Sequence, residues 1–194
     1  YGGLYRDVNF IEVNDGHFDL LMDGTEAVFV TPHNVGKTRV DLFPVNADGA
    51  TVHVELKDAE GNTVGQADTD AVDHTHVLID VKNPHLWNGL ADPYLYTCEA
   101  ALSVDGTVTD TVSTHFGARY YHVDPQKGFF LNGRSYPLRG VCRHQDWKGI
   151  GNALHREHHE TDMAIIREMG ANTLRLAHYQ HDQYFYDLCD EAGL

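Results

Sequence analysis

Two short stretches of the chain place charged and imidazole side chains directly after an apolar run. Residues 139–147 deliver His144 in this way, and residues 173–179 deliver Arg175 and His178. A guanidinium group binds anionic and polar ligands, and an imidazole group can both bind ligands and transfer protons. A parallel α/β barrel places its chemistry at the C-terminal ends of its strands, which is where both stretches put these side chains. They therefore predict a functional site, the alternative being that the same side chains only order loops.

A group of three histidines could suggest a metal site. His155 and His159 are four residues apart and share a face of the predicted helix, with His158 beside them. No carboxylate or thiol completes a ligand set of the kind that zinc requires. We expect this group at the solvated start of the helix, and we predict no metal or cofactor in this chain. Three further histidines are expected on solvent faces of strands or turns: His53, His74 and His76.

The last third of the sequence alternates strand and helix patterns. A hairpin is predicted over residues 129–136, because Asn132-Gly133 is a strong turn signal. A strand over 137–141, a helix over 156–169, a strand over 171–176 and a helix over 181–192 follow with short connections. This order is typical of parallel βα units. Two such units cannot bury their own apolar faces, so we expect them to be the start of a larger barrel.

The first two thirds of the sequence read as a β module. Short alternating segments are separated by turn residues such as Asp105-Gly106. The predicted strands are residues 10–13, 27–31, 38–43, 51–56, 63–67, 76–81, 96–104 and 108–116. About seven strands in about 100 residues is the size of an immunoglobulin-like sandwich, which we interpret as a scaffold. Residues 119–128, with Asp124-Pro125, read as a linker.

Aromatic residues gather near residues 84–87 and 93–96, where Trp87, Tyr94 and Tyr96 lie. Exposed tryptophan and tyrosine form sugar-binding surfaces in some proteins. In a sandwich such rings more often fill one end of the core, so we favour packing.

The formal net charge of −15 argues against nucleic acid and anionic membrane surfaces as partners. No apolar run approaches the roughly 18 residues that span a bilayer.

The three cysteines, Cys98, Cys142 and Cys189, show no paired spacing, so we expect reduced, buried thiols and, weakly, a cytoplasmic location. The chain begins at Tyr1 and ends at Leu194 just after a helical pattern, so we expect a fragment of a longer parent protein.

Three motifs carry a resemblance to a known family: residues 133–146, 168–179 and 187–194. Together they resemble glycoside hydrolase family 2, and within it the bacterial β-galactosidases. Residues 2–8 resemble the last strand of that family's N-terminal sugar-binding jelly roll, and residues 84–87 and 93–96 resemble its immunoglobulin-like middle domain. The resemblance thus implies four segments: the end of a jelly roll (1–8), an immunoglobulin-like sandwich (9–118), a linker (119–128) and the start of a TIM barrel (129–194).

The family resemblance also implies a mechanism. Family members are retaining glycosidases with one Glu as general acid/base and another as nucleophile. No Glu here matches either motif, so both are expected beyond Leu194 and the chain alone is predicted to be inactive. A divalent cation is possible in the parent. The residues implied to contact the sugar are His144, Arg175 and His178, with Asp146 and Trp147 as candidates for either sugar contact or loop packing.

We therefore predict a parent that hydrolyses terminal β-D-galactosides, since the loop at residues 144–147 resembles that of the galactosidases more than that of other family members. A β-glucuronidase or β-mannosidase of the same family and a noncatalytic carbohydrate-binding or packing module are the alternatives. The expected partner is a carbohydrate. We expect a homo-oligomer for the parent, and for the chain alone edge pairing or swapping at its last barrel strand.

Overall fold

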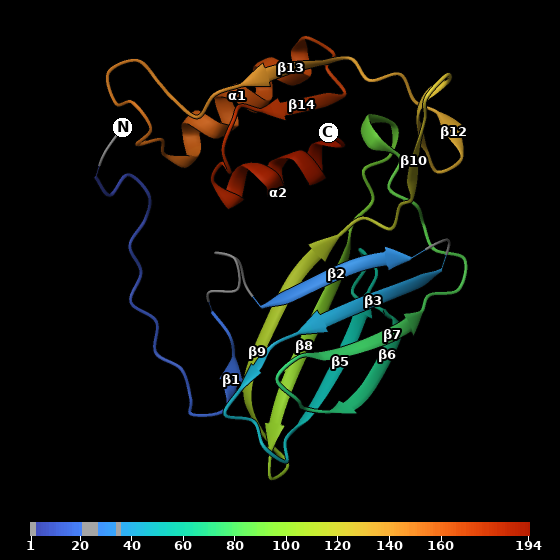
Figure 1. The fold of residues 1–194 in the computed structure, drawn as a ribbon, viewed down its shortest axis with the longest axis vertical. Coiled ribbons are helices and arrows are strands. Elements are labelled where there is room, and N and C mark those ends of the chain that lie inside the picture. The colour runs from blue at the N-terminus through green and yellow to red at the C-terminus, as the bar shows by residue number, and fades with distance from the viewer. Residues whose placement is uncertain (1–2, 21–26, 34–35) are drawn as a thin grey trace. The chain divides into compact units, whose positions relative to one another are not determined.

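The chain folds into two units with different sheet types (Figure 1). The computed structural model describes residues 3–20, 27–33 and 36–194. We call Ile11–Trp87 with Tyr94–Tyr120 the sandwich unit. The remaining residues, 1–10 with Asn88–Pro93 and Tyr121–Leu194, form what we call the C-terminal unit.

The sandwich unit is built from antiparallel strands. One sheet has the order β2-β3-β7, with β2 at Val28–His33, β3 at Lys37–Leu42 and β7 at Thr75–Asp80. The other has the order β6-β5-β8-β9, with β5 at Thr51–Lys57, β6 at Thr63–Asp70, β8 at Tyr96–Val104 and β9 at Thr107–Phe116. A short pair joins β1 at His17–Phe18 to β4 at Pro44–Val45.

Alternating side chains from both sheets form one core. On β5, Val52, Val54 and Leu56 are fully buried while their neighbours are partly exposed. Val40 and Leu42 of β3 belong to the same buried cluster. Because successive strand residues point to opposite faces, this pattern puts one face of each sheet inside, as in the predicted sandwich.

Hairpin turns in both units follow the predicted chemistry. Asp105 (φ 49°) and Gly106 (φ 77°) connect β8 to β9. Asn132 (φ 50°) and Gly133 (φ 77°) connect the later strands β11 (Gly128–Leu131) and β12 (Arg134–Ser135). Two successive positive φ angles are what a tight hairpin turn needs, and Asp, Asn and Gly tolerate them.

The predicted strand at residues 10–13 is wrong. These residues form no strand, and Phe10 is 95% exposed. A strand needs a hydrogen-bonded neighbour, and within the described residues none pairs with this segment. The first strand is β1, four residues further on. The predicted jelly-roll end falls on residues 1–8, of which 1–2 lie outside the described residues and 3–8 carry no strand.

A three-stranded sheet begins inside the segment expected to be a linker. β10 (Tyr121–Asp124), β11 (Gly128–Leu131) and β12 (Arg134–Ser135) pair in that order. The Asp124 carboxylate accepts bonds from the backbone N–H groups of Gln126 and Lys127, both at 2.8 Å, and so closes a turn at Asp124-Pro125. The linker prediction fails at residues 121–124 because the same turn residues end a loop or a hairpin equally well.

Two parallel strands and two helices follow. β13 (Gly140–Arg143) pairs in parallel with β14 (Thr173–Leu176), and α1 (Arg156–Glu168) connects them; α2 (Gln183–Ala192) follows β14. Both helices pack on one face of the strand pair, where Met163, Ile166 and Phe185 form a buried cluster with apolar residues of the two strands.

β13 begins later than the predicted strand at 137–141. The Asn172 side chain accepts a bond from Arg139 N at 2.7 Å and donates to the Pro137 carbonyl at 2.9 Å. The Asn172 side chain thus occupies backbone groups of Arg139 and Pro137 that would otherwise pair with a neighbouring strand. Parallel pairing therefore starts at Gly140, which lies opposite Thr173.

Candidate functional site

Side chains at the end of β13 alternate between two environments. Cys142, His144 and Asp146 are exposed, whereas Arg143 and Gln145 are 5% and 1% exposed. Such alternation is the signature of extended backbone, which sends successive side chains to opposite faces. One set therefore faces away from the helices, and the other set is buried against them.

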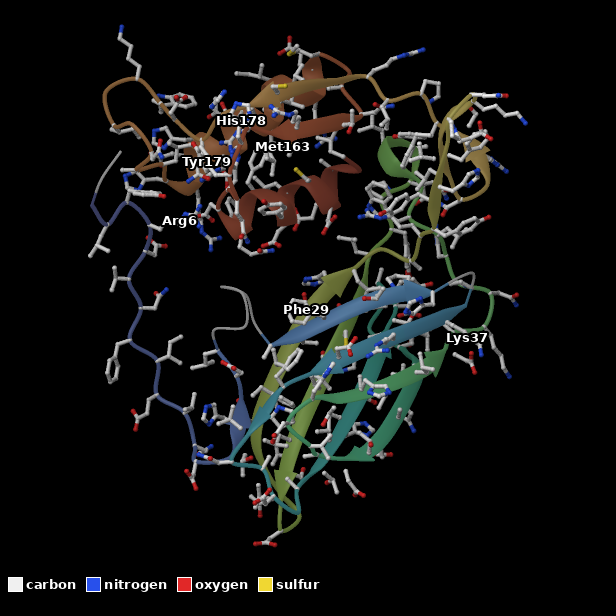
Figure 2. All side chains as sticks on the ribbon, in the orientation of Figure 1. Arg6, Phe29, Lys37, Met163, His178 and Tyr179 are labelled. Atoms are coloured by element: carbon white, nitrogen blue, oxygen red, sulfur yellow. The ribbon has the colours of Figure 1, made fainter. Side chains whose placement is uncertain are left out.

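The structure brings three of the predicted site residues together on the exposed side. Nη2 of Arg175 donates to Nδ1 of His178 at 2.6 Å, and the rings of His144 and His178 meet edge to face with centroids 5.5 Å apart. Figure 2 labels His178 just beyond the end of β14, where the peptide bond from Ala177 is cis. Because Arg175 can only donate, Nδ1 of His178 is an acceptor, and the ring's remaining N–H is on Nε2.

Asp146 and Trp147 lie differently. Asp146 is exposed. Trp147 donates from its backbone N–H to the Gly151 carbonyl at 2.9 Å, and its ring packs against His158 with centroids 4.9 Å apart. Trp147 thus has the loop-packing contacts that were one of its two predicted roles. Sugar contact by any of the five residues stays a prediction.

Arg143 anchors the buried side of the same strand. Its Nε donates to Asp162 at 2.8 Å and forms an ion pair with it. Its Nη1 and Nη2 lie 3.1 Å from Nδ1 of His181 and of His159. The guanidinium also stacks on the Phe185 ring at 3.8 Å. One buried cation thereby joins β13 to α1, α2 and the loop between β14 and α2.

His159 corrects the expectation of a solvated histidine group. It is only 2% exposed, and His181, which the sequence analysis did not select, is 1% exposed. His159, Met163 and Ile166 recur at helical spacing and form the buried face of α1. That spacing is the signal that could have identified His159 as a buried residue.

Burial and the nearby Arg143 charge lower the pKa of both His159 and His181, with burial the larger cause. The carboxylates of Asp182 and Asp162 oppose the shift at His159. The two imidazoles therefore stay neutral at pH values where an ordinary histidine begins to gain a proton.

Gln145 makes a second link between loops. Its side-chain oxygen accepts a bond from the Asp182 backbone N–H at 2.7 Å, and its backbone carbonyl accepts from the Tyr179 hydroxyl at 3.3 Å. Asp182 in turn caps α2 by accepting from Tyr184 N at 3.0 Å. The loops after β13 and β14 are thus tied to each other and to the start of α2.

In the described part of the chain, no group of three or more His, Cys, Asp or Glu side chains is arranged to hold a metal ion. The three thiols are free, but of the three expected to be buried only Cys98 is; Cys189 is half-buried and Cys142 is exposed. Burial raises the pKa of Cys98 and of Cys189 to about 12 in each case. None of the described helices is long and apolar enough to cross a membrane.

The aromatic cluster of the sandwich unit is a packing feature. Trp87 is 5% exposed, and the Arg119 guanidinium covers its ring at 4.5 Å. A side chain at Gly117 would collide with this indole. Trp87 therefore presents no face for stacking on a sugar, as the packing interpretation predicted.

Both units match models of one protein family. Residues 26–119 match the model described as glycosyl hydrolases family 2, and residues 123–194 match the TIM barrel domain of glycosyl hydrolases family 2. These matches confirm the predicted fold class of an immunoglobulin-like domain followed by the start of a TIM barrel.

Curated relatives and solved structures agree with the family models. The chain is 39% identical to a β-glucuronidase of Bacteroides fragilis over 100% of this chain and 30% of that protein. It is 34% identical to a β-galactosidase of Bacteroides ovatus over 82% of this chain and 19% of that protein.

Among solved structures, an FMN-binding β-glucuronidase from Faecalibacterium prausnitzii L2-6 superposes with a TM-score of 0.90 at 44% identity, covering 100% of this chain and 31% of that one. A putative β-galactosidase from Bacteroides fragilis superposes with a TM-score of 0.85 at 36% identity, covering 94% of this chain and 29% of that one. The chain thus spans about a third or less of these proteins, and the higher identities are to those named β-glucuronidases.

Proposed function

We propose that this chain, which belongs to glycosyl hydrolase family 2, is the segment of a β-glucuronidase that carries the immunoglobulin-like sandwich and the first two βα units of the barrel. The proposal takes up one of the alternatives from the sequence analysis in place of β-galactosidase. Galactoside specificity is not confirmed.

One observation carries the choice of sugar. Over its full length the chain is 39% identical to one protein named a β-glucuronidase and 44% identical to another. Its identity to the β-galactosidase of Bacteroides ovatus is lower, 34%, over a shorter part of the chain. β-Galactosidase therefore remains the second candidate.

The site geometry supports sugar binding by the strand-end residues. The Nε2–H group of His178 is left to donate to a sugar hydroxyl, because Arg175 occupies Nδ1. His144 lies beside it. Hydrogen bonds to sugar hydroxyls that strengthen as the ring approaches an oxocarbenium-like state contribute to rate in retaining glycosidases.

The catalytic pair of a retaining enzyme would lie outside this chain. In that mechanism a carboxylate attacks the anomeric carbon while a carboxylic acid protonates the leaving oxygen, and water then displaces the enzyme carboxylate. The glutamates nearest in sequence to the site, Glu157, Glu160 and Glu168, are exposed on α1, and Glu191 is exposed on α2. None of them stands at the strand-end cluster.

The test compares two chromogenic substrates on the full-length protein that contains this segment. We expect p-nitrophenyl β-D-glucuronide to be hydrolysed with kcat/KM at least about 100-fold higher than p-nitrophenyl β-D-galactopyranoside, because sites built for a charged or polar substituent reject analogues that lack it. A preference for the galactoside would overturn the proposal in favour of the second candidate.

A further arm uses the 194-residue chain alone. It is expected to hydrolyse neither substrate. Turnover by the purified chain would show that its own residues supply the catalytic carboxylates, against the assignment above.

A further inference from the structure

The residues that flank His144 on either side are both buried and both bonded to other elements. Arg143, before it, contacts Asp162, His159, His181 and Phe185 (distances above). Its backbone carbonyl also accepts from Ala177 N at 2.8 Å, which ties it to the residue before His178.

Gln145, after His144, bonds to Asp182 and Tyr179. Tyr179, labelled in Figure 2, directly follows His178. The backbone at His144 is therefore fixed from both sides, and the same two anchors reach the segment that carries His178.

The contacts of Arg143 with the two imidazoles require one protonation state. A guanidinium has donors only, so Nδ1 of His159 and Nδ1 of His181 must each offer a lone pair. A protonated imidazole has N–H groups on both nitrogens and would set donor against donor and cation against cation at 3.1 Å. The buried Nε2 of His181 makes no hydrogen bond within the described residues.

We propose that Arg143 and Gln145 are positioning residues that hold His144 beside His178, and that Arg143 does so only while His159 and His181 are both neutral. The role assigned to His144 rests on the proposed function. The protonation state of the cluster does not.

The surroundings of each imidazole favour the neutral form. Burial and then Arg143 lower the pKa of His159, with His158 adding to the effect and Asp182 and Asp162 opposing it. Burial and then Arg143 lower the pKa of His181. There Arg6 and His159 add to the effect, and the Ala177 backbone opposes it.

The consequence for pH follows from linkage. The unfolded chain takes up protons on histidine below a pH of about 6.5, while the folded cluster does not. Stability is therefore full above about 6.5 and falls as the pH drops below that value, until the lower folded pKa values are reached. Placement of His144 is expected to weaken only as the pH falls through the lower folded pKa values, where the two imidazoles gain protons.

The first experiment is ¹⁵N NMR of the histidine rings in the chain. We expect His159 and His181 to be neutral at pH 7, with the proton on Nε2, and to remain so at pH 6. A proton on Nδ1 of either buried ring, or a protonated ring at pH 7, would overturn the cluster assignment whether or not the protein is a glucuronidase.

The second experiment measures kcat/KM on p-nitrophenyl β-D-glucuronide from pH 5 to 8 in the full-length protein. We expect Arg143→Lys to lower kcat/KM by about 10- to 100-fold, the usual effect of displacing a binding group by about 1 Å. Arg167→Lys, at an exposed arginine on the same helix-bearing unit, is the control and should match the wild type.

A third variant keeps the proposal testable if Arg143→Lys does not fold. His159→Asn with His181→Asn retains an acceptor near each Nδ1 position but cannot gain a proton, so the decline of kcat/KM between pH 6 and 5 should become at least about threefold shallower than in the wild type. An unchanged profile, or wild-type activity in Arg143→Lys, would refute the positioning role. If the wild type cleaves no glucuronide, the proposed function fails, and NMR alone judges the cluster.

Discussion

The guanidinium of Arg175 donates to Nδ1 of His178 at 2.6 Å, across three residues at the end of β14. Nη1 of the same guanidinium lies 4.0 Å from the Cys142 sulfur on β13. Arg175 thus contacts the following loop and the neighbouring strand with one planar group, which a lysine ammonium cannot reproduce.

Arg175→Lys should therefore lower kcat/KM of the full-length protein on p-nitrophenyl β-D-glucuronide by about 10- to 100-fold, because His178 loses the donor that sets its tautomer and orientation. Arg156→Lys is the matched control, since Arg156 is exposed and stacks on Tyr184 at 4.5 Å. Equal kinetics for the Arg175 variant and the wild type would contradict a role for this contact.

Thiol reactivity should distinguish Cys142 from the other two cysteines. Burial raises the pKa of Cys98 and Cys189 to about 12, so both remain protonated at pH 8, whereas Cys142 is exposed. We expect one thiol of the folded chain to react rapidly with a disulfide reagent at pH 8, and three after denaturation.

Cys142→Ser should remove the rapid phase, and Cys189→Ser should leave it intact. Two or more rapid thiols in the folded chain would mean that a second cysteine is accessible.

Acid stability of the sandwich unit should depend on Asp41. Hydrogen bonds from Arg39, the largest cause, and from His74 lower the pKa of Asp41 against the effect of burial. The unfolded carboxyl titrates near pH 3.9, so this stabilisation is full above that value and disappears as the pH falls through the lower folded pKa.

Asp41→Asn is expected to cost about 1 kcal/mol of unfolding free energy at pH 7, and to flatten the pH dependence below about 4. Urea unfolding at pH 7 and at pH 3 measures both effects. Asp80→Asn, at an exposed carboxylate on β7, is the control. It should change the unfolding free energy by no more than about 0.5 kcal/mol at either pH.

Leu56→Ala tests the core of the sandwich. Leu56 is fully buried on β5, and removing its side-chain carbons leaves a cavity between the two sheets. We expect a loss of about 2–5 kcal/mol in unfolding free energy by urea titration. Val108→Ala, at a side chain that is 57% exposed, should cost less than about 0.5 kcal/mol. A loss below about 1 kcal/mol for Leu56→Ala would argue against a close-packed core at this position.

Local patterns in the sequence sufficed for much of the fold. The alternation of apolar and polar residues over β5 identified a strand and its buried face, because side-chain direction in a strand reverses at every residue. Asp105-Gly106 and Asn132-Gly133 identified their hairpins, because few residues tolerate two successive positive φ angles. The positions of His144, Arg175 and His178 directly after apolar runs likewise identified them as site candidates.

Tertiary structure decided what local patterns leave ambiguous. Residues 121–124 became a strand through pairing with β11, and residues 10–13 did not because no described strand pairs with them. The burial of His159, His181 and Gln145 depends on which elements meet around Arg143, a set of contacts between residues up to 38 positions apart. Sequence determined which side chains the chain carries to its strand ends, whereas long-range packing decided which of them are exposed and which are buried as supports.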